Sequence, residues 1–119
     1  MSLDVLFRFA SRKNEKPARL ECKIKRMKLE ACIETIEEAK AAAEHGLNRV
    51  ELCAALDLGG LTPSAALIEA SSKIIETHVM IRPRAGNFVY STEELVLMKL
   101  DIEIAAKLGA TGVVFGCLT

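Results

Sequence analysis

Strand-like and helix-like segments alternate along this chain from residue 28 onward, and this alternation limits the folds available to it. A short internal repeat supports the pattern, because the spacing Ala43-x-x-Gly46-x-x-x-Val50 recurs as Ala106-x-x-Gly109-x-x-x-Val113. Strand and helix in regular succession predict a parallel sheet with right-handed crossovers. The expected strands are residues 28–33, 48–53, 78–82 and 113–116.

Three helices are expected between these strands, and local signals predict where they begin. Residues 35–38 (TIEE) and 91–94 (STEE) are capping boxes, in which a hydroxyl and a glutamate satisfy the first backbone N–H groups. Thr62 is expected to cap the middle helix, with Pro63 at its first position, where a missing N–H is harmless. Gly46 and Gly109 are expected to end the first and third helices.

Polar side chains on the strands favour a barrel over a doubly wound sheet. In a doubly wound sheet helices cover both faces, so strands should be apolar throughout. Here polar side chains occupy alternating strand positions, which places them on one face. A barrel accepts such a face at the carboxyl-terminal mouth, so we expect part of a TIM-type (β/α)8 barrel, with about four parallel strands and three intervening helices. The alternating polar residues are Glu30, Cys32, Glu51, Cys53 and Arg82.

Charge divides the chain into two parts. Residues 1–26 hold eight Lys or Arg against three acids, whereas residues 27–119 hold eight against thirteen. We expect residues 1–26 to be a disordered basic extension and residues 27–119 to be the barrel portion. A short basic helix acting as a mitochondrial presequence is an alternative, but acidic residues disfavour it. Nucleic-acid binding is not expected, because the extension has little aromatic interleaving.

Hydropathy and cysteine usage limit the environment of the chain. No apolar run reaches the roughly 18 residues that span a bilayer, so no membrane association is expected. Without an apolar secretory signal, the four cysteines are read as reduced thiols and not as a disulfide framework.

Five motifs follow one another within residues 27–119: KLEACI (28–33), NRVELC (48–53), GGLTPS (59–64), VMIRPRAGNFVYS (79–91) and GVVFG (112–116). Together they resemble the CutC copper-homeostasis family. The resemblance implies a TIM-type barrel, a cytoplasmic location and a Cu(I)-binding role. It covers the N-terminal half of such a protein only, since a complete barrel needs about 250 residues.

Cys32 and Cys53 are the candidate metal ligands. Cu(I) is soft and prefers thiolate and thioether donors. Two thiols on adjacent strands about 4.8 Å apart could hold it, provided that the registers match. The competing interpretation is that both thiols merely pack, as buried cysteines often do. The methionines do not form a clustered motif, so Met27, Met80 and Met98 are expected in the core.

Glu30, Glu51, Arg82 and Arg84 form the second candidate group. Carboxylates inside a barrel require partners, and the two arginines are the expected cations. One interpretation is an ion-pair network that fixes the barrel mouth. The alternative is an enzyme site, with a carboxylate as acid or base and the arginines clamping a small anionic metabolite.

The sequence names no reaction, so whether the chain is an enzyme stays open, and a non-functional fragment is a third possibility. His78 is expected to be structural. The first and fourth strands would be open sheet edges, so the folded chain is expected to form a homo-oligomer.

Overall fold

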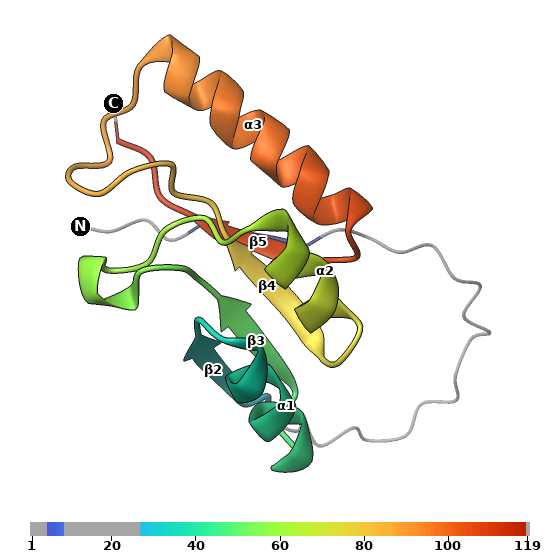
Figure 1. The fold of residues 1–119 in the computed structure, drawn as a ribbon. Coiled ribbons are helices and arrows are strands. Elements are labelled where there is room, and N and C mark those ends of the chain that lie inside the picture. The colour runs from blue at the N-terminus through green and yellow to red at the C-terminus, as the bar shows by residue number, and fades with distance from the viewer. Residues whose placement is uncertain (1–4, 9–26, 119) are drawn as a thin grey trace, which may run out of the picture.

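The computed structural model describes residues 5–8 and 27–118, which form a five-stranded sheet and three helices (Figure 1). The sheet order is β1-β5-β4-β3-β2, so the four later strands lie side by side in chain order. The elements are β1 (Val5–Arg8), β2 (Glu30–Ile33), α1 (Ile36–Glu44), β3 (Arg49–Leu52), the short 3-10 helix η1 (Leu56–Leu58), α2 (Ala65–Ser72), β4 (Glu76–Met80), α3 (Thr92–Lys107) and β5 (Gly112–Phe115).

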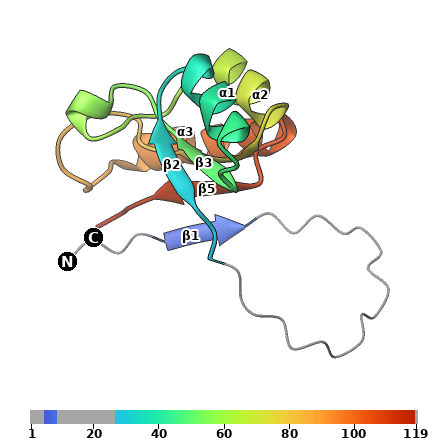
Figure 2. The same cartoon turned by 90° about the horizontal axis from the view of Figure 1, so that it is seen from below.

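The four strands β2 to β5 are parallel, and the three helices connect them. Figure 2 shows the helices together on one side of the sheet, which leaves the other side without a helical layer among the described elements. This one-sided arrangement is that of a barrel wall, because a doubly wound sheet would have helices on both sides. The expected fold, a partial TIM-type barrel, is confirmed.

The core lies between the helices and the sheet. Alternate strand residues point toward the helices, and those of β3 and β4 are almost completely excluded from water. Small residues of α1 and α3 let these helices approach the strands closely. The core side chains are Ile33, Ala39, Ala42, Val50, Leu52, Ile68, Val79, Ile81, Met98, Ala105, Ala110 and Val113.

The capping signals were correct at two helices and wrong at the third. Thr35 and Ser91 both form complete capping boxes with the glutamates three residues later. Thr62 does not cap α2. Ser64 does, by accepting a hydrogen bond from the N–H of Leu67. Thr62 is instead tied to the segment after β4, because its hydroxyl accepts a hydrogen bond from the N–H of Arg82 and its own N–H donates to the Arg82 carbonyl.

The fourth parallel strand is not an open edge. β1, which lies within the basic extension, pairs antiparallel with β5 from Val5 opposite Phe115 to Arg8 opposite Gly112. The rest of the extension, including Cys22, lies outside the described residues. At the opposite end, β2 pairs only with β3 among the described strands.

Candidate metal centre

The side of the sheet that faces away from the helices carries a row of polar and sulfur-containing side chains. Parallel pairing aligns this row across the strands, with Cys32 opposite Glu51 and Glu51 opposite His78. In a barrel this face becomes the interior. Toward the carboxyl ends of the strands, the side chains of this row contain sulfur and belong to Cys32, Cys53 and Met80.

Cys32 and Cys53 lie close enough to share a metal ion. Their Sγ atoms are 3.8 Å apart, although the residues are twenty-one positions apart in the chain. The contact arises because β2 and β3 are adjacent, and because Cys53 follows Glu51, the partner of Cys32, by two residues. The Glu51 carboxylate belongs to the same group, in which all ligand atoms lie within 4.8 Å of one another. The two strands are therefore neighbours, as the sequence predicted, but their register places the two cysteines diagonally and not opposite each other.

The two thiols differ in exposure, and both resist ionisation. Cys53 is completely buried, and this burial raises the pKa of its thiol far above the usual range, with Cys32 and Glu51 adding to the shift. Cys32 is exposed, yet loss of surrounding water still raises its pKa, partly offset by the contact with Cys53. Both groups are therefore protonated at neutral pH, so a cation must displace protons to bind them.

An ion-pair cluster occupies the other end of the same face, near the amino ends of the strands. Glu30 is paired with Arg49, and the Nδ1 atom of His78 lies 3.8 Å from the Glu30 carboxylate. Glu76 lies on the far side of the imidazole, 3.6 Å from Nε2, and 3.9 Å from the amine of Lys28. Glu30 thus has the cationic partner that its position requires, but this partner is Arg49 and not one of the two expected arginines.

The thiol group and the ion-pair cluster lie at different positions along the barrel axis, and this difference indicates different roles. Barrel enzymes place their chemistry at the carboxyl ends of the strands, whereas the opposite face serves stability. The thiols of Cys32 and Cys53 lie toward the first end and the pair Glu30–Arg49 toward the second. His78 lies in the middle of β4 and is buried between them, in keeping with the structural role expected for it.

Arg82 binds the loops that surround the thiols. Its guanidinium donates to the carbonyls of Leu58 and Gly60, at 2.8 and 3.1 Å, and to the Gly86 carbonyl at 3.0 Å. It also lies 5.1 Å from the centre of the Phe88 ring and is 8% exposed. These contacts join the segment after β3 to the segment after β4.

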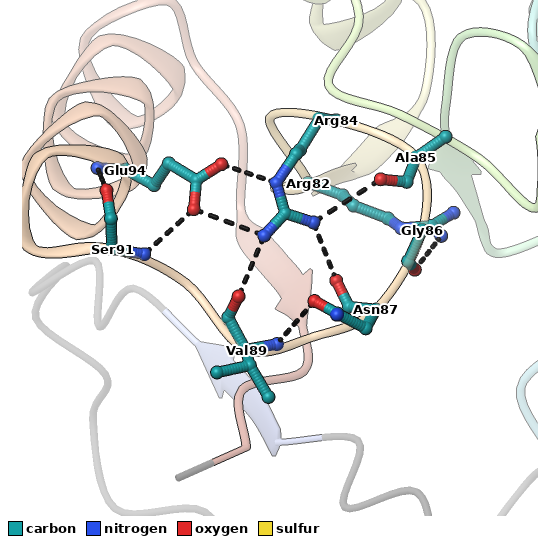
Figure 3. Close-up of polar contacts among 8 residues, drawn as sticks. All are labelled: Arg82, Arg84, Ala85, Gly86, Asn87, Val89, Ser91 and Glu94. Atoms are coloured by element: carbon teal, nitrogen blue, oxygen red, sulfur yellow. Dashed lines mark hydrogen bonds and ion pairs between the residues drawn. The ribbon is translucent and has the colours of Figure 1, made fainter.

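Arg84 organises the loop between β4 and α3 (Figure 3). It donates to both carboxylate oxygens of Glu94. The same Glu94 carboxylate completes the cap of α3, and the Arg84 guanidinium holds the pKa of Glu94 below its usual range. Three further bonds go to backbone carbonyls, so the five N–H groups of a guanidinium are matched by five hydrogen bonds. The carbonyls belong to Ala85, Asn87 and Val89.

The structure therefore brings Cys32, Cys53 and Glu51 together, and it places Glu30, Arg82 and Arg84 in separate sets of contacts. Cys117 is exposed after β5 and is not part of the metal-ligand group found among the described residues.

Two neighbours of the site were missed by sequence reasoning. Met98 packs in the core as expected, whereas Met27 is 84% exposed and Met80 lies on the sulfur-bearing face. Alternation along β4 could have placed Met80 there, because it follows His78 by two residues. Gly60 belongs to the GGLTPS motif, and its backbone lies directly against the Cys53 side chain.

A strand–helix wall with two paired thiols at the carboxyl end of its sheet defines a TIM-type barrel protein with a candidate soft-metal site. Comparison with protein families matches residues 27–119 to the CutC family. The chain belongs to the CutC family.

Individual relatives agree with this assignment. The family protein CutC of Pasteurella multocida is 50% identical over 95 residues, which is 78% of this chain and 39% of the relative. That of Bacteroides fragilis strain ATCC 25285 is 52% identical over 93 residues, covering 76% of this chain and 37% of the relative. The chain thus spans about two-fifths of the length of these curated relatives.

A solved structure shows the same fold. The crystal structure of CutC from Streptococcus agalactiae, whose name provisionally assigns it to copper homeostasis, matches with a TM-score of 0.66 and 38% identity. The match covers 73% of this chain and 44% of that one. In the described part of this chain, no helix is both long enough and apolar enough to cross a membrane.

Proposed function

We propose that this chain serves copper homeostasis in the cytoplasm by binding Cu(I) between Cys32 and Cys53. The observation that carries the proposal is the 3.8 Å separation of the two Sγ atoms at the carboxyl end of the sheet. Cu(I) prefers sulfur donors and accepts low coordination numbers, so two thiols from neighbouring strands fit it. The family assignment supports the same ion, because the name of the Streptococcus agalactiae relative refers to copper homeostasis.

The surroundings of the thiols also support a cation. Loss of both thiol protons would place two negative charges next to the Glu51 carboxylate, which already disfavours ionisation of Cys32 and Cys53. A bound cation removes this penalty, since a coordinated thiol is deprotonated by the metal itself. The buried Cys53 would bind the ion on the side of the protein interior, and the exposed Cys32 would bind it on the side open to solvent.

The alternative proposal is an enzyme that acts on a small anionic metabolite through Glu30, Glu51, Arg82 and Arg84. Its anion clamp would have to come from guanidinium groups that already donate to carbonyls and, at Arg84, to Glu94. We therefore favour metal binding. A thermal shift with a small anion that disappears in Arg82→Ala, while the fold is retained, would favour the enzyme.

A competition titration tests the copper proposal. Anaerobic, reduced protein is titrated against a chromophoric Cu(I) chelator, and the affinity of the wild type is compared with that of Cys32→Ser and Cys53→Ser. Each substitution should lower the affinity by about 100-fold or more, since removing a ligand costs at least as much as disturbing its surroundings. Cys117→Ser is the matched control, because this exposed thiol lies outside the group. Equal affinity in all four proteins would exclude the site.

A further inference from the structure

Met80 lies beside the thiol pair on the third strand of the wall. The pairing of β3 with β4 puts Leu52, the last residue of β3, opposite Val79, so the next residues along the chain are Cys53 and Met80. Successive residues of a strand point to opposite faces, and Val79 faces the core. The Met80 side chain therefore lies on the same face as Cys53, where it is half-buried.

Gly60 lies against both of these side chains. A methyl group added to Gly60 would lie 3.2 Å from the Sγ atom of Cys53 and 3.6 Å from the Cε atom of Met80. The thiol and the end of the thioether side chain thus border the same small space. The sulfur of Met80 is bonded directly to Cε, and rotation about the flexible side chain can turn it toward Cys53 without moving the backbone.

We propose that the thioether of Met80 is the third ligand of the Cu(I) site. The inference rests on the proposed copper binding by Cys32 and Cys53. It extends a two-sulfur site to three sulfurs: Cys32 lies in β2, Cys53 directly follows β3, and Met80 ends β4.

The chemistry of the neighbours favours Met80 over Glu51 as this third ligand. Cu(I) binds soft thioethers well, whereas a carboxylate oxygen is a hard donor that suits other metals. A thioether also carries no charge. Two thiolates and the Glu51 carboxylate already bring negative charge to the site, and a neutral third donor adds none.

The decisive measurement is X-ray absorption on the copper-loaded protein labelled with selenomethionine. The selenium edge should show a copper neighbour in the wild type, and Met80→Leu should abolish this signal. Leucine conserves side-chain volume, so the fold should be retained. Met98→Leu is the matched control, because it removes a buried core methionine on α3 and should leave the signal intact.

Affinity provides the second readout. Met80→Leu should weaken Cu(I) binding by about 10-fold or more, while Met98→Leu should bind like the wild type. If the protein binds Cu(I) with no copper–selenium neighbour, and Met80→Leu binds equally well, Met80 is not a ligand, although the two-thiol site stands. A copper–oxygen shell that disappears in Glu51→Gln would overturn the inference in favour of Glu51. Wild-type protein that binds no Cu(I) would remove the proposed function itself.

Discussion

Each of the two cysteines contributes something that the other lacks. Cys53 is fully buried and held by a strand end, whereas Cys32 is exposed on the neighbouring strand. Burial and the nearby carboxylate raise the pKa of both thiols, so neither is a free thiolate at neutral pH. Reactivity toward alkylating or oxidising agents follows the thiolate. Both thiols are therefore expected to react more slowly with such reagents than an ordinary exposed cysteine does.

This proton competition predicts a steep pH dependence of copper affinity. Because the pKa of each thiol is raised, Cu(I) must displace one proton from Cys32 and one from Cys53 across the neutral range. Affinity should rise with pH, by up to about 100-fold per pH unit, and in Cys32→Ser the slope should fall to about 10-fold. Titrations against a chelator of known proton dependence, between about pH 6 and pH 8, measure both slopes. An affinity that does not change with pH would mean that the thiols are not the ligands.

Among single residues, the sequence predicted which side chains share the face of the candidate site better than it predicted the contacts around them. Alternation on two strands was enough to place Cys32, Glu51 and Cys53 on one face, because that requires only the two-residue period of a strand. The partner of Glu30 was missed because Arg49 opposes it across a strand pair, and that register follows from packing of the whole sheet. Met80 was assigned to the core because an isolated methionine carries no motif.

At the level of elements, the loop between β3 and α2 shapes the space beside the thiols. Gly60 adopts a positive φ of +89°, which other residues avoid, and its backbone abuts Cys53 and Met80. Arg82 holds this loop in place through the carbonyl of Gly60. The sequence could not show this arrangement, because it joins a loop to a side chain twenty-two residues later. The same long-range tie draws Thr62 away from the helix cap that its local sequence predicted.

Substitution of Gly60 should therefore affect both stability and copper binding. Gly60→Ala must place a side chain at positive φ, which costs about 1–2 kcal/mol in the free energy of unfolding, and its Cβ would crowd the Cys53 thiol. Gly46→Ala is the matched control, since it has a similar φ of +76° but no atom within 4 Å of the added Cβ.

Denaturant unfolding should show a similar loss in the free energy of unfolding for both variants, because both place a side chain at a positive φ. Only Gly60→Ala should also lower Cu(I) affinity in the chelator titration. An equal affinity in both variants would mean that the loop does not press on the site.

At the scale of the whole molecule, the described part of the chain has two surfaces that favour association. β2 pairs on one side only, which leaves backbone groups available to another strand. In addition, α3 exposes apolar side chains along one stripe, and these line a cleft of about 510 Å³ together with the segments that precede α2 and follow β4. The stripe consists of Leu97, Leu100 and Ile104, which are 54%, 47% and 42% exposed.

These surfaces predict that the chain self-associates, with the α3 stripe of one copy covered by another. Light scattering after size exclusion should give a mass above the 13.0 kDa of one chain. The double substitution Leu97→Gln and Leu100→Gln should shift the population toward the monomer, because it removes apolar area that water disfavours. Lys99→Gln is the matched control, since it changes an exposed residue between the two and leaves the stripe intact. A monodisperse 13.0 kDa particle with a cooperative melting transition would show that neither surface drives association.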